Sequence, residues 1–172
     1  MRRALGFTLL EMLVVITIVG LLVGGAVLSL GLLGRDATVS REFDRLVTRL
    51  TYLRERAELE NRPYGMQLMT RGYEFALFDS QSAQWLPLRD DLLPAHRWPK
   101  GLEAEVYIEG RRIVLADKNG SNATPALGVD ATGEYTDFEI RLRRVGDNEL
   151  EFLRPAPNGG LQRGTHSGLA VR

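Results

Sequence analysis

Cysteine is absent from this chain of 172 residues, and histidine occurs only twice. The lack of cysteine excludes a disulfide framework, a thiolate metal site and a cysteine nucleophile. The two histidines, His96 and His166, lie in segments that we expect to be surface loops, and neither has metal-ligand spacing to a second histidine. We therefore predict that the protein has no metal site and no cofactor.

An excess of charge of either sign is also missing, since 22 basic side chains balance 22 acidic ones. This balance excludes the general electrostatic attraction by which basic proteins bind nucleic acid. The acidic pair Asp90-Asp91 lacks the further oxygen ligands that a calcium site needs. We identify no nucleophile with a base and an orienting group, so we predict no catalytic residues and no enzyme activity.

What the chain does have is a long uncharged run, Met12 to Gly34, close to its start. These 23 residues are enough to cross a membrane as a helix, which takes about 20 residues. One carboxylate, Glu11, stands at the N-terminal edge of the run. A carboxylate in such a segment costs roughly 2.5–3.5 kcal/mol at the centre of the span, so Glu11 requires a partner of opposite charge.

Two simple explanations leave part of this segment unexplained. A cleaved signal peptide has a shorter apolar stretch, of about 7–15 residues, and ends in a small-residue cleavage site that this run lacks. A plain signal anchor keeps the basic residues Arg2 and Arg3 in the cytoplasm and accounts for every feature except Glu11.

The run Gly6–Glu11 reads GFTLLE and stands between a basic leader and the apolar segment, so it resembles the processing site of type IV pilin-like proteins. The resemblance implies that a prepilin peptidase cuts between Gly6 and Phe7 and that Phe7 becomes N-methylated. Glu11 then matches the family's glutamate at the fifth mature position. It lies one helical turn after Phe7, where it can neutralise the amine of its own chain or of a neighbouring subunit. We predict that Glu11 guides the subunit into a filament.

The helix is expected to continue beyond the apolar run. From Arg35 to Asn61, apolar residues recur at spacings of three and four, which places them on one face, as in a helix that packs on a sheet. The residues of this face are Val39, Phe43, Leu46, Val47, Leu50, Leu53 and Ala57. Charged residues, including Glu42, fill much of the remaining surface. Pro63 predicts the end of the helix, which would be roughly 80 Å long if it began at Phe7.

Short strands follow Pro63. We predict three antiparallel hairpins and an edge strand over Gln84–Leu88, where Pro87 cannot donate a ladder hydrogen bond. The hairpin arms are Tyr64–Met69 with Tyr73–Phe78, Leu102–Ile108 with Arg111–Ala116, and Asp137–Arg144 with Glu149–Arg154. In the last hairpin, alternation predicts a core-facing set of Phe138, Ile140, Leu142, Leu150 and Phe152. Residues 155–160 break this hairpin, and a glycine-rich tail is expected to follow.

The predicted fold class is α+β, with a long N-terminal helix packed on an antiparallel β-sheet domain of one or two sheets; this is also the type IV pilin-like fold that the N-terminus implies. We expect a cleaved prepilin leader at 1–6 and a transmembrane and filament-core helix at 7–34. Its amphipathic continuation would occupy 35–62 and a β-rich periplasmic domain 63–172. By the positive-inside rule, the protein would be a single-pass protein of the bacterial inner membrane with its C-terminal domain in the periplasm.

Aromatic residues and prolines between Tyr73 and Pro94 extend the resemblance. Together with the N-terminal motif, they make the chain similar to the H-type minor pseudopilins of type II secretion, the general secretion pathway protein H family. The resemblance implies a structural subunit at or near the tip of the pseudopilus, which helps to export folded proteins across the outer membrane. The implied partners are other minor pseudopilins, the major pseudopilin, the inner-membrane assembly platform, the prepilin peptidase and, as a further candidate, exoprotein cargo.

The alternative is a minor pilin of a type IV pilus that acts in adhesion, twitching or DNA uptake, because such proteins share this N-terminus. DNA binding requires a basic surface. Arginines do occur on the late strands, for example Arg141 and Arg154, but acidic residues such as Glu139 and Glu151 alternate with them. We therefore expect a mixed, solvated strand face and do not expect nucleic acid as a partner.

Overall fold

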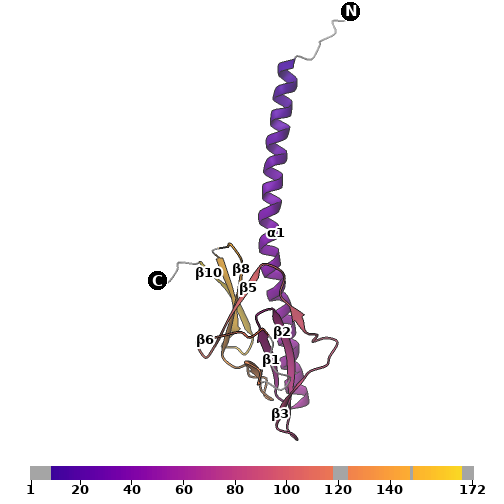
Figure 1. Ribbon diagram of the computed structural model, residues 1–172, viewed down its shortest axis with the longest axis vertical. Coiled ribbons are helices and arrows are strands. Elements are labelled where there is room, and N and C mark those ends of the chain that lie inside the picture. Colours follow the sequence, from indigo (N-terminus) through magenta and orange to yellow (C-terminus); the bar gives the residue numbers. More distant parts are fainter. Residues whose placement is uncertain (1–8, 118–123, 148, 168–172) are drawn as a thin grey trace, which may run out of the picture. The chain divides into compact units, whose positions relative to one another are not determined.

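The computed structural model describes residues 9–117, 124–147 and 149–167, without the side chains of residues 24–37 and 167. The chain divides into two compact units, Met1–Thr38 and Val39–Arg172. The described residues form one helix, α1 (Leu9–Glu60), and ten strands. All ten strands belong to the second unit, where β1 and β2 lie along the last turns of α1 (Figure 1).

The last turns of α1 bury the apolar face that the sequence predicted. Its buried members are Val39, Phe43, Leu46, Leu50, Leu53 and Ala57, and Val47 is partly buried against them. The helix ends at Glu60, as expected before Pro63. Asn61 takes a left-handed φ of 50°, and the Arg62 N–H donates to the Ala57 carbonyl at 3.1 Å, which satisfies one of the last helical carbonyls.

The first sheet has the strand order β3-β2-β1-β7, with β4 also paired to β2. Its strands are β1 (Tyr64–Met69), β2 (Gly72–Asp79), β3 (Gln84–Pro87), β4 (His96–Arg97) and β7 (Leu127–Val129). β1 and β2 form the first predicted hairpin, and β3 lies at an edge, where the proline at its end is tolerated. The short strands β4 and β7 were not predicted.

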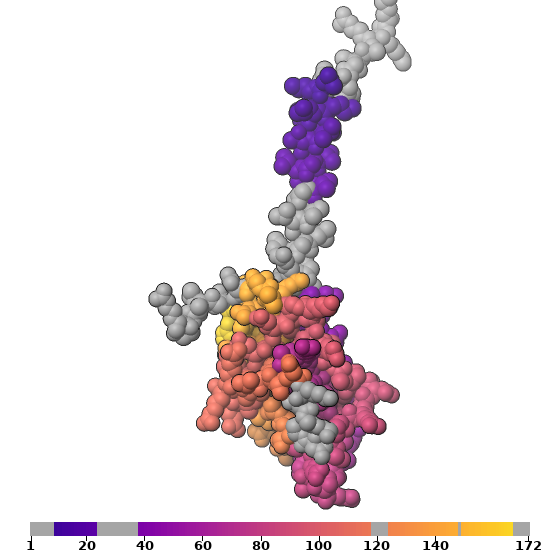
Figure 2. Space-filling view, in the orientation of Figure 1, coloured from indigo at the N-terminus to yellow at the C-terminus, as the bar shows by residue number. Residues whose placement is uncertain are grey.

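The second sheet has the order β10-β9-β8-β5-β6. Its strands are β5 (Leu102–Ile108), β6 (Arg111–Ile113), β8 (Phe138–Arg144), β9 (Glu149–Pro155) and β10 (Leu161–Ser167). The other two predicted hairpins, β5 with β6 and β8 with β9, are confirmed. β10 lies where a glycine-rich tail was expected, so that prediction was wrong. In the space-filling view, the orange and yellow of the later strands cover a different part of the second unit from the magenta of the earlier strands (Figure 2).

The direction of the side chains of β9 also differs from the prediction. Ile140 and Leu153 are cross-strand partners, and so are Arg141 and Phe152. Because cross-strand partners share a face, Leu153 faces the core with Ile140, whereas Phe152 lies on the opposite face with Arg141. The predicted alternation was correct for β8 but shifted by one residue for β9. A shift of one residue moves every side chain of a strand to the other face of the sheet.

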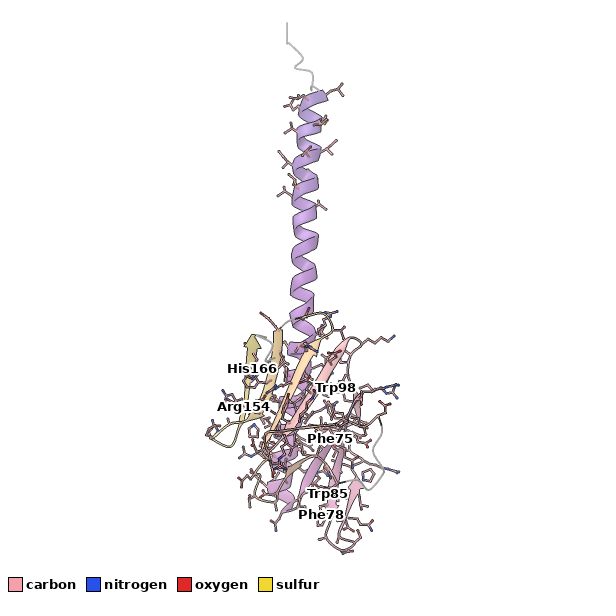
Figure 3. The ribbon with its side chains drawn as sticks, turned by 60° about the vertical axis from the view of Figure 1, so that its left-hand side comes forward. Phe75, Phe78, Trp85, Trp98, Arg154 and His166 are labelled. Atoms are coloured by element: carbon pink, nitrogen blue, oxygen red, sulfur yellow. The ribbon has the colours of Figure 1, made fainter. Side chains whose placement is uncertain are left out.

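Gly164 allows β10 to pair with β9. A Cβ at this position would lie 2.4 Å from Cζ of Phe152, whose ring occupies the space over the strand. That ring stacks on His166 with centroids 4.5 Å apart, and the Arg154 guanidinium lies 5.1 Å from its centroid. His166 and Arg154 are labelled on the β domain in Figure 3. Gly164, one of the glycines of the expected glycine-rich tail, is therefore the residue that makes room for an aromatic side chain.

The β5–β6 turn offers a direct stability test. Glu109 and Gly110 both have positive φ angles, 50° and 73°, as a type I′ hairpin turn requires. Glutamate is poorly suited to the first of these positions, whereas asparagine followed by glycine is the favoured pair. Glu109→Asn should raise the free energy of unfolding by about 0.5–1 kcal/mol in urea denaturation. Glu109→Ala, which keeps the steric cost, should give no such increase.

Candidate functional site

The described start of α1 carries one charged residue among apolar ones. Glu11 lies in the first turn, where the helix dipole favours a carboxylate. The large apolar side chains of this stretch are between 46% and 92% exposed within the chain: Leu9, Leu10, Met12, Leu13, Val14, Val15, Ile16, Ile18, Val19, Leu21, Leu22 and Val23. The Thr17 hydroxyl donates to the Leu13 carbonyl at 2.8 Å. This segment therefore presents an apolar surface on every side of the helix, with Glu11 near its N-terminal end.

The processing residues lie outside the described part of the chain. Cleavage between Gly6 and Phe7 and methylation of Phe7 therefore stay predictions, and so does the pairing of Glu11 with an N-terminal amine. Across the described residues, we find no helix with the length and apolar character needed to span a membrane.

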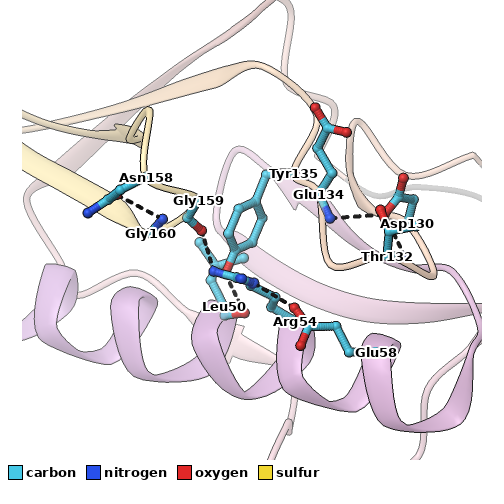
Figure 4. A network of polar contacts seen from close by, with 10 residues as sticks. All are labelled: Leu50, Arg54, Glu58, Asp130, Thr132, Glu134, Tyr135, Asn158, Gly159 and Gly160. Carbon is cyan, nitrogen blue, oxygen red and sulfur yellow. Dashed lines mark hydrogen bonds and ion pairs between the residues drawn. The ribbon is translucent and has the colours of Figure 1, made fainter.

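In the second unit, two hydrogen-bonded anchors tie loops from the two sheets to α1 (Figure 4). The buried hydroxyl of Tyr135, which follows β7, donates to the Leu50 carbonyl at 2.9 Å. Burial raises the pKa of this tyrosine to about 12, so it stays protonated as a donor at neutral pH. Arg54, one turn further along the helix, donates from Nε to Glu58 at 2.9 Å and from Nη1 to the Gly159 carbonyl in the β9–β10 turn.

Asp130 organises the turn that carries Tyr135. Its Oδ1 accepts hydrogen bonds from the Thr132 hydroxyl at 2.7 Å and from the N–H groups of Thr132 and Glu134, each at 2.9 Å. The bond from the Thr132 side chain is the largest influence on the pKa of Asp130, and with the backbone bonds it outweighs burial and lowers that pKa. Asp130 thus acts as the residue that stabilises this turn. Among the described residues, no three histidine, cysteine or acidic side chains group as a metal site would require.

His96 is not the loop residue that we expected. It belongs to β4, and its Nε2 lies 2.7 Å from Oε2 of Glu42 and 3.0 Å from Nη1 of Arg45. Glu42 is only 3% exposed, although it was assigned to the solvated side of the helix. The spacing offered a signal, because Glu42 lies three residues after Val39 and four before Leu46, on the buried stripe itself.

A second ionic cluster holds the end of α1 to the loop after β3. Arg56 donates to Oε1 of Glu60 at 2.7 Å and also pairs with Asp90. A hydrogen bond from the Tyr64 hydroxyl, 2.5 Å from Oε2 of Glu60, and the bond from Arg56 lower the pKa of Glu60. At Asp90, burial opposes ionisation, but the Leu92 N–H and the Arg56 guanidinium outweigh it and lower the pKa.

Acid should therefore destabilise the second unit. Asp90, Asp130 and Glu60 have pKa values lowered by folding, so the unfolded chain binds their protons at higher pH. Their contribution is complete above the unfolded pKa of about 4 and is lost as the pH falls through the folded values. We expect the free energy of unfolding, measured in urea, to fall steadily between about pH 5 and pH 2. Asp130→Asn should flatten this slope, and an unchanged slope in that variant would contradict the assignment.

The late arginines are engaged with neighbouring carboxylates. Arg143 lies 2.7 Å from Glu103, and Arg163 lies 2.6 Å from Glu151 and 3.2 Å from Asp44. Further pairs on this sheet are Arg112 with Glu105 and Arg141 with Glu139, and Arg154 lies 4.0 Å from Glu139. This is the mixed strand face that the sequence predicted.

Comparison with known proteins places the chain in a family. A family model described as "Prokaryotic N-terminal methylation motif" matches residues 1–27. The type II secretion system protein H of Pseudomonas aeruginosa strain PAO1 is 34% identical over 152 residues, which are 85% of this chain and 87% of the relative. This chain belongs to the type II secretion system protein H family. The protein of the same name from Aeromonas hydrophila is 24% identical, over 89% of this chain and 87% of the relative. The one from Klebsiella michiganensis is 27% identical, over 92% of this chain and 94% of the relative.

Solved structures show the same fold. Two structures of the minor pseudopilin EpsH from the type 2 secretion system of Vibrio cholerae match with TM-scores of 0.58 and 0.59, at 21% and 22% identity. They cover 73% and 75% of this chain and 95% and 94% of the EpsH chains. The solution structure of E. coli GspH matches with a TM-score of 0.53 at 17% identity, over 72% of this chain and 84% of that one. The predicted family and the predicted α+β, pilin-like fold class are therefore confirmed.

Proposed function

We propose that this protein is a structural subunit of the type II secretion pseudopilus, a minor pseudopilin at or near its tip that helps to export folded proteins across the outer membrane. The relationship to protein H of Pseudomonas aeruginosa, at 34% identity over 85% of the chain, carries the proposal. The N-terminal methylation motif over residues 1–27 and the shared fold support it.

Each segment of the chain has its own role in this proposal. The prepilin peptidase removes residues 1–6 by cutting between Gly6 and Phe7, and Phe7 is then methylated. Residues 7–34 anchor the subunit in the inner membrane and later lie in the filament core. The exposed apolar side chains of α1 support this role, because they need lipid or neighbouring helices around them. Residues 35–62 continue the helix under the β-rich domain of residues 63–172, which lies in the periplasm.

The protein acts by assembly rather than by catalysis. Its partners are the other minor pseudopilins, the major pseudopilin and the assembly platform of the inner membrane. Glu11 neutralises the N-terminal amine of its own chain or of its neighbour, which makes it an assembly residue. Exoprotein cargo is a further candidate partner for the exposed surfaces of the β domain.

A deletion strain tests the proposal. Exoprotein would be assayed in the culture medium and in the periplasm, with and without the wild-type gene. Folded exoprotein trapped in the periplasm, and released when the gene is restored, supports the secretion role. Normal secretion with loss of twitching or of DNA uptake overturns it and assigns the chain to a type IV pilus instead.

A further inference from the structure

A groove of about 340 Å³ crosses one end of the first sheet. The end is the one at which β1 and β3 begin and β7 finishes, close to the C-terminal end of α1. Nine residues line it: Pro63, Tyr64, Trp85, Gly128, Val129, Asp130, Glu134, Tyr135 and Thr136. All of them belong to the second unit, so the groove does not depend on the first.

One wall of the groove is aromatic and apolar. Trp85 is half-buried and packs edge-to-face on Phe78, with ring centroids 5.4 Å apart, at the lower end of the domain in Figure 3. Pro63 is also half-buried and lines the same groove. The indole of Trp85 and the ring of Pro63 offer the flat apolar contact against which proline-rich segments pack in aromatic-lined grooves.

The opposite end of the groove is acidic. Asp130 and Glu134 are exposed, and neither a lysine nor an arginine is among the nine lining residues. Asp130 is kept ionised by the hydrogen bonds that lower its pKa. Figure 4 shows Glu134 and Asp130 together on the turn that Tyr135 ties to α1. The groove therefore joins an apolar wall to a fixed site of negative charge.

The width of the sheet sets the length of a suitable occupant. In the order β3-β2-β1-β7, with Tyr135 bridged to Val129 beyond β7, Trp85 and Glu134 stand four strand spacings apart. That separation is about 19 Å at 4.8 Å per strand, which about six residues of extended chain would cover. An extended peptide segment of this length would contact both ends.

We propose that this groove binds an extended, proline-containing segment of another protein, with its proline against Trp85 and Pro63 and a lysine or arginine at Asp130 and Glu134. The charge of the rim and the aromatic wall together select this partner. The binding surface lies on the β domain, so the proposal holds whether or not the chain assembles as a pseudopilin.

Fluorescence polarisation with two labelled decapeptides tests the proposal on the full-length protein in non-ionic detergent. One peptide alternates proline with arginine, and the other alternates proline with glutamate. We expect saturable binding of the basic peptide alone. Trp85→Leu should weaken it at least tenfold and Glu134→Gln about threefold to tenfold, whereas Glu149→Gln, an exposed carboxylate on the second sheet, should leave it unchanged.

Two results would overturn the proposal. One is equal binding of the basic and acidic peptides, or binding of neither. The other is an equal loss in Glu134→Gln and Glu149→Gln, which would show a general charge effect rather than a site. Because Glu134→Gln changes one exposed carboxylate, it remains informative if Trp85→Leu fails to fold. Peptide binding is measured without secretion, so its failure is distinguishable from failure of the proposed secretion role.

Discussion

Replacing Glu11 with alanine should lower the secreted fraction of exoprotein at least tenfold while the leader is still removed. Cleavage after Gly6 would create a positive amine in an apolar environment, and Glu11 is the one acidic residue between Leu9 and Gly34. Removing one partner of a buried ion pair costs about 3–5 kcal/mol, because the other charge is left uncompensated. A loss of only about 1.4 kcal/mol already weakens an association tenfold.

The measurement combines three readouts. Mass spectrometry of the mature N-terminus would report processing, co-purification would report assembly with other pseudopilins, and exoprotein in the medium would report secretion. Thr17→Val is the matched control, because it removes a polar group from the same stretch of α1. The Thr17 hydroxyl donates to the Leu13 carbonyl of its own helix. Normal co-assembly of Glu11→Ala, after normal processing, would show that the carboxylate has no assembly role.

The largest loss of stability is expected from Gly72→Ala. A Cβ on Gly72 would lie 1.9 Å from the His96 carbonyl oxygen and 2.9 Å from the Arg97 Cα. Both atoms belong to the backbone of β4, so no side-chain rotation can relieve the clash. β4 must then leave β2, and His96 moves away from the buried carboxylate of Glu42. We expect the free energy of unfolding to fall by about 3 kcal/mol or more in urea denaturation.

Gly128→Ala is the matched control for this change. Gly128 also lies within a strand of the first sheet, but the nearest atom to its added Cβ is the Thr136 hydroxyl oxygen at 3.2 Å. A side-chain hydroxyl can shift by a few tenths of an ångström, so the loss should stay below about 1.5 kcal/mol. Equal losses in the two variants would mean that the close approach of β4 to Gly72 has no special role.

The hairpins were predictable because their signals are local. The arms of β1 with β2, β5 with β6 and β8 with β9 are separated by short turns, and each arm carries alternating or β-prone residues. β10 was missed because Gly164 lies in the segment that we expected to be a glycine-rich tail. Its role appears only when β9 is paired beside it, since the ring of Phe152 fills the space over the glycine.

The predictions for Leu153 and His96 were wrong for the same reason: both residues depend on contacts with distant parts of the chain. Alternation predicts that every second residue of β9 faces the core, but the register against β8 decides which set does so, and it places Leu153 opposite Ile140. His96 and Glu42 are 54 residues apart, and no local pattern connects them. The position of Glu42 on the buried stripe did carry a signal that it needed a partner, although not which one.

The sequence by itself determined the family, through the run Gly6–Glu11 before a long apolar segment, and the α+β order of one helix followed by hairpins. It also determined the buried face of α1, because helical periodicity depends only on residues a few positions apart. The tertiary structure alone decided the pairing of Glu42 with His96, the strand β10 and the groove between Trp85 and Glu134. These features depend on strand register and on loops brought together from distant parts of the chain, which local periodicity and turn chemistry do not specify.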